Sequence, residues 1–166
     1  MKNLLTNILD WIYKKKCYFC GRSNENIKMC SQCFDELEYL PFETNREILN
    51  KKTYCAGVYE SNLQKLIRGL KYHRQKDLAY FQAKFMYDYW QQISNKKEIY
   101  QIVPIPLFKT REKERKYNHM NLVAEEFSKL SGYQVNSELI ERIKDTKPQY
   151  KLNKTQRMEN LANAFK

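Results

Sequence analysis

Residues 17–33 have the sequence CYFCGRSNENIKMCSQC, which determines the fold of the N-terminal part of the chain. The cysteines in this stretch have the spacing Cys-x2-Cys-x9-Cys-x2-Cys. Two short turns of this kind each present two thiolates, and four thiolates complete the tetrahedral shell that Zn²⁺ prefers. Gly21, directly after the second cysteine, supplies the conformational freedom that such a turn needs. The pattern therefore predicts one zinc ion, with Cys17, Cys20, Cys30 and Cys33 as its ligands.

The predicted zinc site is structural, because four thiolates close the shell, whereas a catalytic zinc usually keeps one position for water. Four free thiols or redox-active cysteine pairs are the alternative interpretation. Cys55 stands apart from the group, in a segment that resembles a strand. We expect it to be a small buried apolar residue and not a ligand.

Before the cysteines, apolar residues recur at helical spacing and are followed by lysines at 14–16; they are Leu5, Ile8, Leu9 and Ile12. A signal peptide carries its positive charge before the apolar stretch, and a membrane-spanning helix needs about 20 apolar residues. A short amphipathic helix that packs on its own domain is favoured over attachment to a membrane. The expected location is the reducing cytoplasm, where paired cysteines indicate metal ligands before disulfides.

After the cysteines, the apolar pattern predicts alternating strands and helices. A strand is expected in TYCAGVYE (53–60). The segment IYQIVPIPLF (99–108) indicates a buried strand that runs into a loop, because its two prolines end the pairing, and YQVNSELIERI (133–143) suggests a short strand with a turn into another element. Helical stripes run through 63–70, 78–93 and 123–130, with Gly132 as a C-cap, and a last helix is expected before residue 165. This alternation favours an α/β fold with a parallel sheet. We predict a zinc-binding module at 1–50 and a second domain at 51–166.

The charge balance favours a polyanionic partner. Lys and Arg outnumber Asp and Glu by 30 to 19, which gives a formal net charge of +11. The alternative is a lysine-rich composition without a nucleic-acid role, as in many AT-rich genomes. Tyr72, Tyr117 and Tyr150 lie next to basic residues and are candidates for stacking on bases of single-stranded DNA, or else ordinary half-buried tyrosines.

Two basic segments are the predicted phosphate or nucleic-acid contacts. One is the end of the first helical stripe, with Lys71 and Arg74. The other is a loop after the proline-terminated strand; its candidates are Lys109, Arg111, Lys113, Arg115, Lys116 and Asn118. Glu112 and Glu114 offset part of this charge, so a solvated loop is the alternative. His73 and His119 have no partner at metal or catalytic spacing, and we expect surface or hydrogen-bonding roles for them.

Three sequence segments after the cysteines, taken in this order, carry a resemblance to a known family: GLKYHRQKDLA (69–79), VPIPLFKTREKERKYNHMNLVAEEF (103–127) and RIKDTKPQYKLNKTQRMENLANAF (142–165). The chain resembles the ComF family, competence-associated proteins built like type I phosphoribosyltransferases. The family pattern has Arg-Gly-Phe-Asn-Gln after the Val-Pro strand, and here Lys116 stands at the glycine.

The resemblance implies an incomplete phosphoribosyltransferase-like domain. The family's acidic, glycine-rich loop for phosphoribosyl pyrophosphate should lie just beyond Phe165, so the chain looks C-terminally shortened. By resemblance, a flap over the site carries Arg142, Thr146, Gln149, Arg157 and Asn160. The alternative role for that segment is capping, with Thr155 as the cap of the last helix and Asn153 in the preceding turn.

The resemblance also implies a function in natural competence and transformation: the handling of incoming single-stranded DNA in the cytoplasm, with a helicase-type partner that could recruit the chain to the membrane uptake machinery. The alternative is an enzyme that binds or transfers a phosphoribosyl group, which the missing loop makes doubtful. Phosphoribosyl pyrophosphate and Mg²⁺ are therefore not expected, and neither is a catalytic residue.

Overall fold

The computed structural model describes residues 16–23, 27–95 and 98–166. The amphipathic helix predicted from Leu5 to Ile12 lies outside these residues. Among the described helices, none is long and apolar enough to cross a membrane.

The chain divides into two compact units, Met1–Ile93 and Ser94–Lys166. The predicted division into 1–50 and 51–166 stays a prediction, because compactness and ancestry need not divide a chain at the same point.

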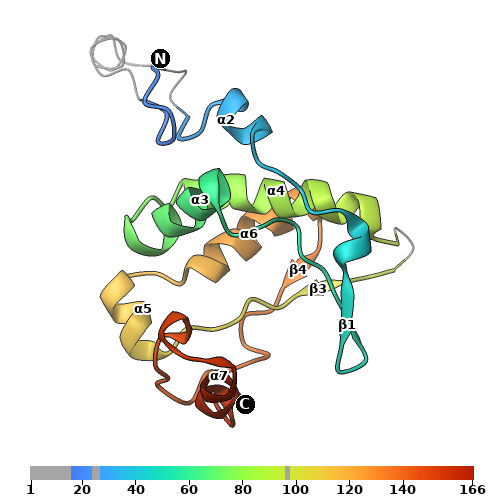
Figure 1. Ribbon diagram of the computed structural model, residues 1–166, viewed down its shortest axis with the longest axis vertical. Coiled ribbons are helices and arrows are strands. Elements are labelled where there is room, and N and C mark those ends of the chain that lie inside the picture. The colour runs from blue at the N-terminus through green and yellow to red at the C-terminus, as the bar shows by residue number, and fades with distance from the viewer. Residues whose placement is uncertain (1–15, 24–26, 96–97) are drawn as a thin grey trace. The chain divides into compact units, whose positions relative to one another are not determined.

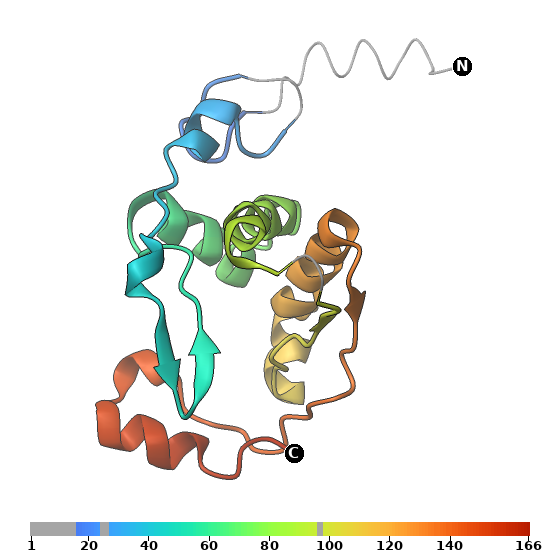
Figure 2. The same ribbon diagram turned by 90° about the vertical axis from the view of Figure 1, so that its right-hand side faces the viewer.

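Two helices form the core of the first unit, α3 (Ser61–Tyr72) and α4 (Leu78–Ile93). They pack side by side, as Figure 1 and Figure 2 show. Both were predicted from their apolar stripes, and the structure confirms them. Leu66 and Leu70 of α3 are fully buried one turn apart, and Phe85 of α4 is 2% exposed. The aromatic stripe of α4 is therefore core, as expected.

Short elements precede these helices in the first unit: α2 (Ser31–Asp35), the 3₁₀ turn η1 (Phe42–Thr44), β1 (Arg46–Ile48) and β2 (Lys51–Thr53). β1 and β2 form an antiparallel hairpin, with Arg46 opposite Thr53. Leu49 and Asn50 in its turn both have positive φ, the geometry of a type I′ hairpin. The hairpin was not predicted.

The second unit contains β3 (Gln101–Ile102), α5 (Lys109–Arg115), α6 (His119–Ser131), β4 (Gln134–Val135), η2 (Gln149–Lys151) and α7 (Lys154–Leu161). β3 and β4 are parallel, with Gln101 opposite Gln134. Helix α6, which precedes β4 in the chain, also contacts β4. The fold is therefore mixed α/β with a small parallel sheet, as predicted. Helix α6 ends at Gly132, which has a left-handed backbone and is the C-cap that the sequence predicts.

The strand predicted in 53–60 is wrong, whereas the strand predicted in 99–108 is present but shorter than expected and not buried. In 53–60 only Thr53 belongs to a strand, and Cys55 is exposed rather than buried. In 99–108 the strand is β3, and it is not buried, because Gln101 is exposed and Ile102 is half-buried. The prolines do stop the pairing as expected, because the strand ends before Pro104.

Two further local predictions are wrong. The basic residues after β3 form helix α5 and not a loop. The cap of the last helix is Asn153 and not Thr155: Asn153 Oδ1 accepts from the N–H of Gln156 at 2.9 Å, and Gln156 Oε1 accepts from the N–H of Asn153 at 3.0 Å. This is a capping box, which satisfies two backbone donors that the helix itself cannot pair.

Candidate metal centre and basic surfaces

The four predicted cysteines come together. The Sγ atoms of Cys17, Cys20, Cys30 and Cys33 all lie within 4.8 Å of one another. Cys20 Sγ and Cys30 Sγ are 3.8 Å apart, which matches the edge of about 3.8 Å expected for thiolates on zinc bonds of about 2.3 Å in a tetrahedron. The donor set is all thiolate and closed. It fits a metal such as zinc, whose role here would be to hold the two cysteine turns together.

Backbone hydrogen bonds shape the first cysteine turn, which we call the knuckle (residues 17–22). The Gly21 N–H donates to the Cys17 carbonyl at 2.9 Å, and the Cys17 N–H donates to the Arg22 carbonyl at 2.8 Å. Gly21 has φ +74°, in the region that glycine enters without strain. The predicted reason for a glycine at this place is therefore confirmed.

The second pair of cysteines is placed by α2. Cys30 is the N-cap of this helix and Cys33 lies in its first turn, so both thiols face the same point. Cys17 Sγ accepts hydrogen bonds from the backbone N–H groups of Phe19 and Cys30, each at 3.4 Å. The two turns are thus already joined by protein contacts around a shared sulfur.

The four thiols differ in acidity because their surroundings differ. The backbone N–H of Arg22, and then its guanidinium, lower the pKa of Cys20 to about 6. Burial raises the pKa of Cys33 above its ordinary value, and hydrogen bonds with the neighbouring thiols add to the rise. For Cys17, burial alone would raise the pKa, but donors from the backbone of Cys20, Cys30 and Phe19 outweigh it and lower the pKa.

Arg22 was missed at the level of sequence. It lies two residues after Cys20, and its guanidinium stabilises the Cys20 thiolate. Nothing in the Cys-x2-Cys spacing indicates a charged neighbour, since its effect depends on how the knuckle folds. Cys55 is not part of the cluster, in agreement with the prediction that it is not a ligand.

The basic end of α3 carries the first set of predicted contacts. Arg74 is exposed and has φ +54°, and Lys71 is half-buried. Between them Tyr72 is 59% exposed, and the guanidinium carbon of Arg68 lies 5.8 Å from its ring centroid. An aromatic face with cations around it is what stacking on a nucleic-acid base requires.

The second set lies on and after α5, in the other unit. Lys109 forms an ion pair of 3.8 Å with Glu141. Arg111 donates to the Thr146 carbonyl and lies 3.9 Å from Asp145. Part of this positive charge is therefore engaged by the segment that follows β4, while Lys113 and Lys116 are exposed.

Two predicted phosphate contacts in this set have protein partners. Arg115 donates a hydrogen bond to His119 Nδ1 at 2.7 Å. The ring nitrogen is therefore the acceptor, and one guanidinium donor is used within the protein. Asn118 is 7% exposed and caps α6, because its Oδ1 accepts from the Met120 N–H at 3.0 Å. Tyr117 is 8% exposed and is not available for stacking, whereas Tyr150 is 72% exposed.

The predicted flap residues meet within the segment from β4 to the end of the described chain. Arg142 donates to the Thr146 hydroxyl, and the Arg157 Nε donates to the Gln149 carbonyl at 3.1 Å. Asn160 makes two hydrogen bonds to the backbone of Lys147. The side chains of Arg142, Arg157 and Asn160 therefore support the conformation of their own segment.

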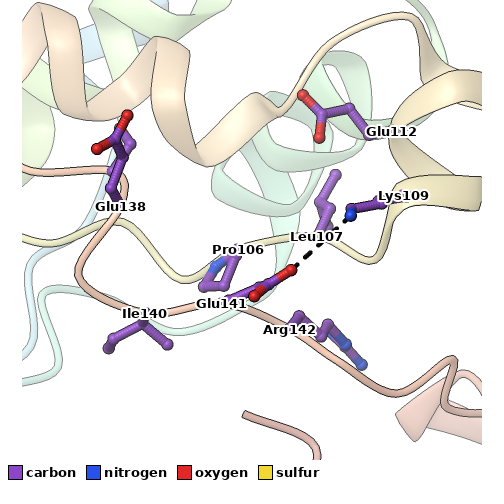
Figure 3. Close-up of a pocket in the computed structure, with 9 residues that line it drawn as sticks. Pro106, Leu107, Lys109, Glu112, Glu138, Ile140, Glu141 and Arg142 are labelled. Carbon is purple, nitrogen blue, oxygen red and sulfur yellow. Dashed lines mark ion pairs between the residues drawn. The ribbon is translucent and has the colours of Figure 1, made fainter. Parts of the chain in front are cut away.

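A pocket of about 320 Å³ lies in the second unit (Figure 3). Its walls come from the residues that follow β3 and β4: Pro106, Leu107, Lys109, Glu112, Ser137, Glu138, Ile140, Glu141 and Arg142. The carboxyl ends of parallel strands are where open α/β sheets usually bind ligands. Three carboxylates against two cations, however, disfavour a polyanion in this pocket.

One similarity to a known protein emerges from comparison. The chain is 25% identical to Competence protein F of Haemophilus influenzae, over 90% of this chain and 68% of that protein. No protein-family model matches the chain. No solved structure matches it significantly either. This distant homology confirms the predicted resemblance to the ComF family.

Proposed function

We propose that this chain is an accessory protein of natural competence that handles incoming single-stranded DNA on the cytoplasmic side, together with a helicase-type partner. The distant homology to Competence protein F supports the competence context. The net charge of +11 supports a polyanionic partner. The predicted phosphoribosyltransferase-like domain belongs to the same proposal.

The observation that carries DNA handling is the basic and aromatic end of α3. Tyr72 offers an exposed ring, Arg68 lies against it, and Arg74 follows two residues later. Single-strand binders combine cations that follow the backbone with aromatic faces that stack on bases of any sequence. A surface of this composition fits a single strand of mixed sequence.

The phosphoribosyltransferase alternative has weaker support. The described pocket at the carboxyl ends of β3 and β4 is lined by Glu112, Glu138 and Glu141. These carboxylates would repel a pyrophosphate unless metal ions neutralised them. Calorimetry with phosphoribosyl pyrophosphate and Mg²⁺ separates the two functions, since only the enzyme would give saturable heat.

A salt titration of a fluorescent oligothymidine complex tests the proposal. The double variant Lys71→Ala, Arg74→Ala should reduce the salt slope by about 1.4, because each lost contact to a single strand removes about 0.7. The matched control removes two lysines from the hairpin, Lys51→Ala with Lys52→Ala, and should change the slope less. Undetectable binding at low salt would refute DNA handling by this chain.

A further inference from the structure

The knuckle is docked on one face of α3. Lys65 Nζ donates to the Phe19 carbonyl at 2.9 Å, and Tyr18 Oη lies 2.5 Å from His73 Nδ1. Gly69 lies between these contacts. A Cβ at that position would come within 3.1 Å of the Tyr18 ring and 2.5 Å of Leu78. Positions 65, 69 and 73 are four residues apart, so they form a single stripe along the helix.

These contacts reach the metal ligands directly. Tyr18 and Phe19 are the two residues between Cys17 and Cys20. The Lys65 ammonium also lies over both of their rings, at 5.4 Å and 5.7 Å from the centroids. A metal that fixes the two thiolates would therefore also fix the Phe19 carbonyl and the Tyr18 side chain, which contact α3.

The basic end of α3 overlaps the end of this docking stripe. Tyr72 directly precedes His73, and Arg74 directly follows it. On a helix, residue 72 lies about 20° from residue 65 in projection, which places the exposed tyrosine beside the docking stripe. Fixing the His73 side chain thus restrains the backbone that presents Tyr72.

The geometry points to a metal-dependent stacking platform. The metal at the four cysteines holds the C-terminal end of α3 through Lys65 and His73, and a base of single-stranded DNA stacks on Tyr72 beside Arg68. The inference rests on the proposed function and adds its regulation: metal binding and DNA binding are coupled although the metal touches no DNA. Coupling of this kind is reciprocal, so DNA strengthens metal binding by the same factor.

The first experiment compares zinc-loaded and chelator-stripped full-length protein. The probe is an oligothymidine of about 15 nucleotides, within the range that single-strand binders cover. We expect removal of zinc to weaken binding about tenfold, a typical size for coupling between two sites. Zinc-loaded His73→Ala and Lys65→Ala should reproduce a large part of this loss with all four thiolates intact. Gln64→Ala, elsewhere on α3, is the matched control and should bind like the parent protein.

The second experiment needs no DNA. Hydrogen exchange of peptides from 61–76 should speed up when zinc is removed, and also in zinc-loaded His73→Ala. In a competition with a chromogenic chelator, His73→Ala should lose zinc more readily than Gln64→Ala does. Tyr72→Ala should weaken DNA binding about tenfold and leave the zinc competition unchanged.

The outcomes separate the inference from the function on which it rests. If the zinc-loaded parent protein binds no oligothymidine, the proposed function fails, while the exchange and competition data still decide the coupling. If the parent protein binds DNA but zinc removal and the contact variants leave affinity and exchange unchanged, the coupling is overturned and the function stands.

Discussion

The side-chain amide of Asn160 forms two hydrogen bonds with the backbone of Lys147. Asn160 Nδ2 donates to the Lys147 carbonyl at 2.9 Å, and Oδ1 accepts from the Lys147 N–H at 3.1 Å. The two residues are 13 positions apart, so the pair joins α7 to the segment before η2. The asparagine that belongs to the family-like motif therefore braces its own segment.

Loss of this brace should destabilise the second unit modestly. We expect Asn160→Ala to lower the free energy of unfolding by about 1 kcal/mol, because two partly exposed hydrogen bonds are replaced by bonds to water. Asn160→Asp keeps the acceptor for the Lys147 N–H and should lose less. Urea denaturation measures both variants. Equal stability of the alanine variant and the parent protein would contradict the structural role.

The backbone at Lys116 should be strained. This residue caps α5 with φ +65°, at the position where the ComF pattern has glycine. A left-handed backbone costs a residue with a Cβ about 1–2 kcal/mol, which exceeds the entropy that a glycine loses. Lys116→Gly should therefore stabilise the chain by about 0.5 kcal/mol in thermal unfolding. Lys113→Gly removes an equal charge from inside the same helix and should instead destabilise it by about 1 kcal/mol.

The parts of the fold that could be predicted are those with local signals. Helices α3 and α4 carry apolar stripes with the helical period, and the Cys-x2-Cys spacing alone indicates metal-binding turns. Helix α5 has the sequence KTREKER, which is polar on every side and so gives no stripe. The hairpin was missed for a related reason: its turn is Leu49-Asn50, without the glycine that usually marks positive φ.

The parts of the candidate site that could not be predicted depend on contacts between distant residues. Tyr18 meets His73 across 55 positions, and no spacing rule links an aromatic residue of a cysteine turn to a histidine at a helix end. The expectation that His73 has a hydrogen-bonding role is consistent with this contact. Asn118 was predicted as a phosphate contact, and its role as the cap of α6 becomes visible only from the hydrogen bond with the Met120 N–H.

Metal content should depend on four of the five cysteines. We expect about one zinc per chain by elemental analysis of the purified protein, since the cluster offers one closed tetrahedral set. Cys30→Ser should lose this zinc and reduce the melting temperature, because the metal contributes to folding of the cysteine module. Cys55→Ser is the matched control: it removes an exposed thiol outside the cluster and should keep both zinc and stability. Zinc loss in Cys55→Ser would show that the ligand set is wrong.

Arg22 should set the pH at which Cys20 of the metal-free protein becomes reactive. The backbone N–H and the guanidinium of Arg22 lower the pKa of this exposed thiol to about 6, so the thiolate is present above that pH and lost below it. Arg22→Ala removes the guanidinium and leaves the backbone donor, so the pKa should rise part of the way towards the ordinary value of 9.0. The rate of Cys20 alkylation by iodoacetamide, followed by mass spectrometry across pH, should then have a higher midpoint, because a higher pKa moves ionisation of the thiol to higher pH. Arg22→Lys retains the positive charge and should shift the midpoint less. An unchanged midpoint in Arg22→Ala would contradict a role for the guanidinium in the acidity of Cys20.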